Sequence, residues 1–187
     1  MIADYDGDMA KLLNVNIEGE LPILATRNII LFPGVIVPIL IGRKQSLNLL
    51  EALGKNQDAV FAVICQKDQN VENPGENDFM QYGVYAKLVK VLEMPGGGNN
   101  VTAIVQGMGR CQLDRITRKM PYIRGEVRPF PEELPNPDDT EFVTAIEDLK
   151  TTTLNYIHEN EELPDDSQFA LTTISNTIIA VNFVCTN

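Results

Sequence analysis

The sequence predicts an α+β fold in which a β-rich section with one short helix precedes an α-helical section. Between residues 21 and 130 the apolar stretches are mostly short and rich in β-branched residues, which is typical of strands. Four prolines then fall within residues 129–137, a cluster typical of a stiff, extended connector. Beyond the connector, apolar residues recur at helical spacing. A chain of 187 residues has room for one large or two small domains.

The β-rich section is expected to hold seven strands. Residues 21–25 and 35–41 form the first two, and Pro38 places the second at a sheet edge or a bulge. The near-continuous apolar run 59–65 predicts a central strand. Residues 81–93 carry apolar side chains on both faces, including Val89 and Val91, which favours a closed barrel or a sheet covered on both sides. The remaining expected strands are 101–107, 111–116 and 123–130.

One short helix interrupts the strands, because Leu47, Leu50 and Leu53 recur at helical spacing and Gly54 can end the helix. Arg43 and Lys44 lie near its start, where the helix dipole disfavours cations. We interpret this as a helix that begins a residue or two later. The alternative is that these cations meet an acidic group of a partner.

The helical section begins after the prolines, where Asp138 and Glu141 resemble a capping box. A second helix opens at 164–168 and an apolar stretch, 178–184, ends the chain, so we expect the natural protein to continue past residue 187. One helical stripe is expected to comprise Phe142, Ile146, Leu149, Thr153 and Tyr156. The expected organisation is a flexible acidic leader (1–19), a β domain (20–130), a connector (131–137) and an incomplete helical subdomain (138–187).

The net charge of −11 is unevenly distributed. Residues 1–20 carry five acids and one lysine, and residues 131–166 carry twelve acids and one lysine, whereas the block 21–130 is +4. An acidic total argues against a dedicated nucleic-acid-binding protein. The uncharged, apolar run 28–42 is too short to span a bilayer and is interrupted by prolines. We therefore expect a soluble, cytoplasmic protein that does not bind membranes.

Catalytic and metal-binding patterns are not found in the sequence. Its single histidine, His158, and its three scattered cysteines match no zinc-site spacing, and the cysteines are expected to be buried free thiols. No serine lies in a nucleophile-elbow motif, and the glycines at 96–98 are not followed by Lys-Ser/Thr as in a phosphate loop. We predict no catalytic residue, no metal and no cofactor on this chain.

Basic residues concentrate between residues 110 and 128. Arg115, Arg118 and Arg124 are the candidates for contacts with a polyanion. The alternative is a solvated sheet edge that cations protect against strand addition.

A set of short motifs in a fixed order resembles the N-terminal domain of the Lon protease family. They are Leu-Pro-Ile-Leu (21–24), Arg-Asn (27–28), Leu-Phe-Pro-Gly (31–34), Pro38, Gly-Arg (42–43), Gln-Lys-Asp (66–68), Asp-Phe-Met (78–80), Gly83, Ala-Lys (86–87), Pro-Gly (95–96), Gly107 and Arg110. The resemblance covers nearly all of the chain after the leader. It departs from the family where Asp-Phe-Met replaces the more usual Asp-Leu-Tyr and where three glycines lengthen the hairpin.

This resemblance implies a PUA-like β pseudo-barrel followed by helices, and a role in selecting unfolded or degron-bearing proteins and in supporting assembly with other Lon subunits. The parent would be a hexameric serine protease with an AAA+ ATPase that uses ATP and Mg, and with a Ser–Lys dyad that this chain lacks. Apolar turn residues are the predicted client contacts: Phe32, Pro33, Pro38, Met94 and Pro95. The alternative for each of them is packing in the core or in a turn. The alternatives are a PUA-type nucleic-acid-binding module and a free-standing Lon-like regulatory protein.

Overall fold

The computed structural model describes residues 12–13, 15–56, 58–93, 100–133, 135–136, 138–160 and 165–186, so most of the predicted leader lies outside the described residues. The strands are β1 (Gly19–Thr26), β2 (Ile36–Ile41), β3 (Val60–Cys65), β4 (Tyr82–Glu93), β5 (Val101–Arg118) and β6 (Arg124–Pro129). The helices are α2 (Lys44–Gly54), the short 3-10 helix η1 (Glu76–Asp78), α3 (Thr140–Glu159), α4 (Asp165–Thr173) and α5 (Thr177–Thr186). This order confirms the predicted α+β class.

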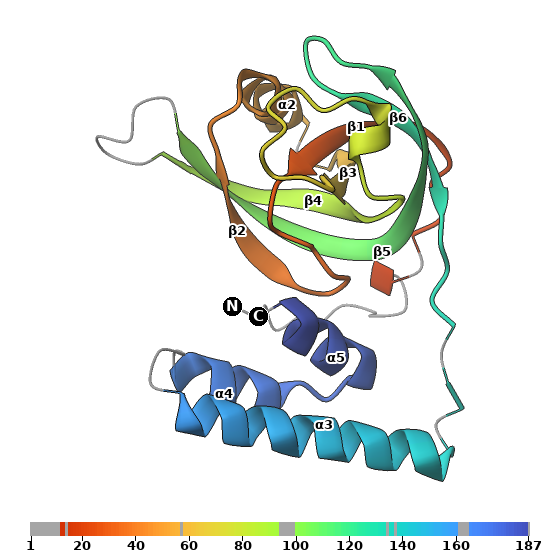
Figure 1. Cartoon of the computed structure of the whole chain (residues 1–187), viewed down its shortest axis with the longest axis vertical. Helices are drawn as coiled ribbons and strands as arrows, with labels where there is room; N and C mark the ends of the chain where they lie inside the picture. Colours follow the sequence, from red (N-terminus) through yellow and green to blue (C-terminus); the bar gives the residue numbers. More distant parts are fainter. Residues whose placement is uncertain are drawn as a thin grey trace.

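The six strands form one mixed sheet that closes on itself (Figure 1). Its order is β2-β5-β4-β3-β1-β6, and an additional pairing of β5 with β6 closes the ring. β1 and β3 are parallel, and the other pairs are antiparallel. The run expected to be central is β3, which lies between β4 and β1. Among the described strands β2 pairs only with β5, so the strand that carries Pro38 is an edge strand, as predicted.

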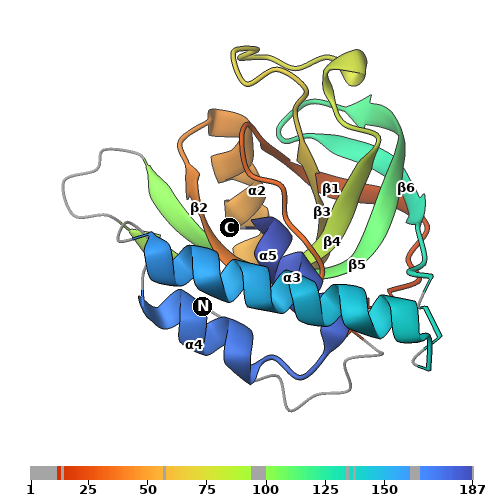
Figure 2. The same ribbon diagram turned by 60° about the horizontal axis from the view of Figure 1, so that its bottom comes forward.

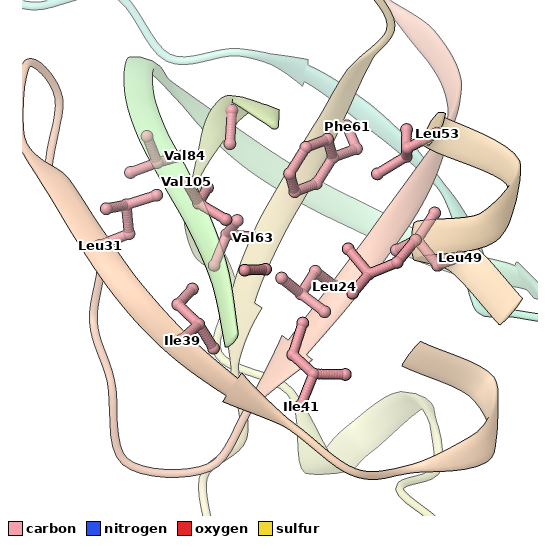
Figure 3. Close-up of a cluster of buried hydrophobic side chains, with 13 residues drawn as sticks. Leu24, Leu31, Ile39, Ile41, Leu49, Leu53, Phe61, Val63, Val84 and Val105 are labelled. Atoms are coloured by element: carbon pink, nitrogen blue, oxygen red, sulfur yellow. The ribbon is translucent and has the colours of Figure 1, made fainter. Parts of the chain in front are cut away.

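Two apolar clusters fill the opposite faces of the sheet. In the first, Leu49 and Leu53 of α2 pack against Leu24, Phe61 and Val105 of the strands (Figure 3). The second cluster contains Ile23, Ala62, Ile64, Phe79, Tyr85, Cys111, Leu113, Ile123 and Val127. Consecutive strand residues point to opposite faces, so the central strands are buried on both sides.

Two strand predictions were wrong in part. Val89 and Val91 are exposed, because the pairing of β3 with β4 extends only to Lys87 and the register of β4 against β5 shifts after Leu88. The strands expected at 101–107 and 111–116 are one continuous strand, β5. The glycines between them do not break it: a Cβ on Gly107 would lie 2.2 Å from the Phe32 carbonyl oxygen, so glycine permits close backbone approach.

The start of α2 also differs from the expectation. The helix begins at Lys44 with Arg43 as its N-cap, and not a residue or two later. The Arg43 guanidinium donates to the Gln66 side chain and, at 3.1 Å, to the Val71 carbonyl oxygen. Gly54 is the last residue of the helix, as predicted.

The helical section lies against one end of the barrel, with α5 between the barrel and the pair α3 and α4 (Figures 1 and 2). The N-cap of α3 is Asp139, one residue beyond the prediction, and its carboxylate accepts from the backbone N–H groups of Glu141 and Phe142. Leu154 and Ile157 of α3 pack against the cluster formed by α4 and α5. The predicted stripe was wrong at Tyr156, which is exposed.

The three cysteines are free thiols, but only Cys111 is buried. Cys65 is half-buried and Cys185 is exposed on α5, so the expected burial of all three was wrong. Among the described helices, none is long and apolar enough to cross a membrane.

Candidate functional site

Phe32 and Pro33, two of the predicted client contacts, lie where the barrel meets α5. Pro33 is fully buried, and its carbonyl oxygen accepts from the Asn182 side chain at 3.0 Å. Phe32 is half-buried, with the Arg110 guanidinium carbon 5.5 Å from the ring centroid. Pro33 therefore helps to hold α5 on the barrel and in this arrangement is not accessible to a client, whereas Phe32 packs against Arg110, which itself donates to Asn182 of α5.

The other predicted contacts lie elsewhere. Pro38 is exposed on the edge strand β2, opposite Ile104 of β5. Met94 and Pro95 lie outside the described residues. Of the three predicted contacts that the structure describes, Phe32 and Pro33 therefore lie at the junction with α5, whereas Pro38 lies on the edge strand.

The candidate polyanion residues are largely paired with carboxylates. Arg115 forms two hydrogen bonds with Glu126, at 2.8 and 2.6 Å, and Arg124 lies 2.8 Å from a Glu20 carboxylate oxygen. The pKa of the Glu20 carboxyl is lowered, first by the hydrogen bond from Thr117 and then by Arg124. Arg118 is exposed and forms no ion pair with the described residues. Paired cations have little charge left for a polyanion, which argues against such a surface.

A groove of about 510 Å³ runs between the loop after β1 and the start of β4. Its lining is mostly apolar: Ile29, Ile30, Leu31, Val63, Cys65, Phe79, Met80, Tyr82 and Gly83, with Lys67 and Gln81. Three of these side chains are well exposed, Ile30 at 55%, Met80 at 40% and Tyr82 at 52%. Burying one such side chain under a partner gives roughly 1.5–3 kcal/mol before the costs of association.

A tilted aromatic pair extends this apolar surface beyond the groove. The rings of Tyr82 and Phe130 lie 4.9 Å apart at 51°, and Phe130 is 44% exposed. Phe130 also lines a second cavity, of about 410 Å³, together with Leu13, Val15, Pro129 and Pro131. We call the exposed residues Ile30, Met80, Tyr82 and Phe130 the apolar strip.

Local geometry fixes the strip in place. The Met80 N–H donates to the Cys65 carbonyl oxygen at 2.9 Å, and Phe79 anchors the same segment in the barrel core. Our sequence prediction missed these residues. A signal was available, because Met80 and Tyr82 are two residues apart at the start of a strand and therefore share one face.

Comparison with known proteins identifies the family. The family described as "ATP-dependent protease La (LON) substrate-binding domain" matches residues 20–187. The chain belongs to this family. The Lon N-terminal resemblance seen in the sequence is thereby confirmed.

The chain is similar to part of several full-length Lon proteases. It is 33% identical over 183 residues to the Lon protease of Flavobacterium johnsoniae and 36% identical over 185 residues to that of Parabacteroides distasonis. These alignments cover 96% and 98% of this chain but 22% of each relative. The chain thus corresponds to about a fifth of these Lon proteases and is a fragment-sized substrate-binding domain.

Solved Lon structures share the fold. The N-terminal domain of the Mycobacterium avium complex Lon protease superposes with a TM-score of 0.59 at 15% identity, covering 89% of this chain and 98% of that domain. The Lon N-terminal domain protein from Xanthomonas campestris gives a TM-score of 0.50 at 16% identity, covering 89% and 96%. The Lon substrate-binding domain therefore keeps this barrel-and-helix fold at low sequence identity.

Proposed function

We propose that this Lon substrate-binding domain binds exposed apolar segments of unfolded polypeptides along the apolar strip. The observation that carries the proposal is the groove of about 510 Å³ flanked by exposed Met80 and Tyr82. Methionine and tyrosine suit a surface that must accept many sequences, because methionine adapts its shape and tyrosine offers a large face at a low entropic cost. Pro38, Met94 and Pro95 stay predicted client contacts.

The affinity of one domain for one client segment is expected to be micromolar or weaker. Two or three buried side chains contribute a few kcal/mol, and association costs offset much of this. In the parent, which we propose to be a cytoplasmic homo-oligomer, several domains act together and raise the effective affinity. The remaining parts of that parent are proposed to supply ATP hydrolysis with Mg and peptide cleavage by a Ser–Lys dyad.

The test is a titration of a fluorescently labelled, reduced and carboxymethylated polypeptide with the chain, followed by anisotropy. The variant Tyr82→Asp should weaken binding by about tenfold or more, because the strip would lose apolar area and gain a charge. Tyr156→Asp is the matched control, since Tyr156 is an exposed tyrosine on α3, away from the strip. Equal affinities of the two variants, both with wild-type thermal stability, would contradict the proposal.

A further inference from the structure

Another cavity, of about 340 Å³, lies beside the groove and differs from it in charge. It is bounded by the loop after β1, the end of β2 and the first turn of α2. Two arginines, Arg27 and Arg43, line the cavity together with the polar residues Asn28 and Ser46. Ile29 and Leu40 supply an apolar wall. The cavity therefore combines positive charge with room for an aliphatic side chain.

Arg43 is half-buried, and the hydrogen-bond partners of its guanidinium are neutral. Its guanidinium donates to the Gln66 amide oxygen and the Val71 carbonyl oxygen. Partial burial, and then the proximity of Arg27, lower the pKa of Arg43, and exposed Glu72 opposes this only as the smallest contribution. A partly desolvated cation is normally paired with an anion, so this site favours an incoming negative charge.

Arg27 lies on a well-held loop. The Thr26 hydroxyl donates to the Ile29 carbonyl oxygen at 2.6 Å, and the Gln66 N–H donates to the Thr26 carbonyl oxygen at 2.8 Å. The Arg27 side chain is exposed and forms no ion pair within the described part of the chain. Its charge is therefore available to a ligand, and the backbone that carries it is held in place.

We propose that this cavity binds the C-terminal carboxylate of a client polypeptide whose last side chain is apolar. The carboxylate accepts hydrogen bonds from Arg27 and Arg43, which match its planar geometry, and the last side chain packs on Ile29 and Leu40. Ile29 also lines the groove, so a client in the groove can place its end in the cavity. This inference rests on the proposed function and names a class of client, those with a free apolar C-terminus.

The test compares three labelled peptides of identical sequence except at the end. One ends in leucine with a free carboxylate, one ends in leucinamide, and one ends in aspartic acid amide, which offers only a side-chain carboxylate. The free acid should bind about tenfold more tightly than either amide, because an amidated C-terminus lacks the charged carboxylate that accepts the arginine hydrogen bonds. Arg27→Gln should remove most of this difference.

Arg118→Gln is the matched control, because Arg118 is an exposed arginine on β5 that forms no ion pair with the described residues. This variant should keep the tenfold preference for the free acid over the amides. Equal binding of free acid and leucinamide, or an unchanged preference in Arg27→Gln, would overturn the inference. Equal binding of the aspartic acid amide and the free acid would also overturn it, in favour of a side-chain carboxylate. If the wild-type chain binds neither the peptides nor the unfolded polypeptide, the proposed function fails as well. If Tyr82→Asp still weakens binding of the unfolded polypeptide, only the carboxylate site fails.

Discussion

Arg110 on β5 donates a hydrogen bond to Asn182 on α5, with 3.1 Å between Nη2 and Oδ1. Asn182 is 1% exposed and itself donates to the Pro33 carbonyl oxygen at 3.0 Å. Arg110 also pairs with Glu132 in the segment that leaves the barrel. The buried Asn182 amide therefore joins α5 to the barrel directly, and Arg110 extends this network to the segment that leaves the barrel.

Asn182→Ala should lower the free energy of unfolding by about 1–3 kcal/mol, because it leaves the buried Pro33 carbonyl oxygen and an Arg110 N–H without partners. Urea unfolding followed by circular dichroism measures the change. Asn155→Ala, at an exposed position on α3, is the control and should change stability by no more than about 0.5 kcal/mol. If both variants lose the same amount, the amide does not stabilise the docking of α5.

Gly34 sits in the same junction and has a φ of +81°. A Cβ there would lie 2.7 Å from the Ile179 Cδ1 atom, at the flexible end of that side chain. Gly34→Ala should therefore cost about 1–2 kcal/mol, mainly from the left-handed backbone, and the Ile179 contact should add to it.

Gly54→Ala is the opposite case and serves as the control. Gly54 is the last residue of α2, and an added Cβ would meet no described atom within 4 Å. Alanine should therefore be neutral or stabilise the chain by up to about 1 kcal/mol. Thermal unfolding of both variants checks the pair; a Gly34→Ala variant as stable as Gly54→Ala would show that the junction tolerates a side chain.

The thiols should differ in reactivity, because the structure places them in different surroundings. Burial raises the pKa of Cys111 to about 12, whereas Cys185 is exposed. Thiolates are the reactive form, so an aromatic disulfide reagent at about pH 8 should label Cys185 first and Cys111 only after unfolding. Cys185→Ser should remove the fast phase. A fast phase that persists in this variant, and disappears in Cys111→Ser, would contradict the burial of Cys111.

The parts of the fold that depend on local patterns could be predicted from the sequence. The apolar run of β3 and the leucine spacing of α2 both predicted the observed element, because each pattern reflects which residues of a single element are buried. The continuity of β5 could not be predicted, because Gly107 is explained only by Phe32, which approaches from another part of the chain. A glycine alone does not distinguish a break from a close contact.

The site was harder to predict for the same reason. In the sequence, Phe32 and Pro33 have the pattern of an exposed turn, but in the fold Pro33 is bonded to Asn182 of α5 and Phe32 packs against Arg110 of β5. The pairing of Arg115 with Glu126 follows from neighbouring strands, but Glu20 and Arg124 are 104 residues apart and meet only after the barrel closes. Tyr82 could have been selected from strand alternation, whereas its contact with Phe130 required the fold.

The charge pairing of the barrel predicts how binding responds to salt. Affinity for the leucinamide peptide should change little, by less than about twofold, between low and high salt, because contact with the apolar strip depends on apolar burial. A single-stranded RNA should bind more weakly than this peptide, since Arg115 and Arg124 already face Glu126 and Glu20.

The measurement is a pair of titrations, with labelled peptide and labelled RNA, at several salt concentrations. A polyanion-binding surface would show a log–log salt slope of about −0.7 for each phosphate neutralised on a single strand. Tighter binding of RNA with such a slope, abolished by Arg115→Ala, Arg118→Ala or Arg124→Ala, would favour the nucleic-acid reading over client binding. We expect the affinity for the peptide to be nearly independent of salt. Tyr82→Asp should weaken this affinity and Arg118→Ala should leave it unchanged, because Tyr82 belongs to the apolar strip and Arg118 does not.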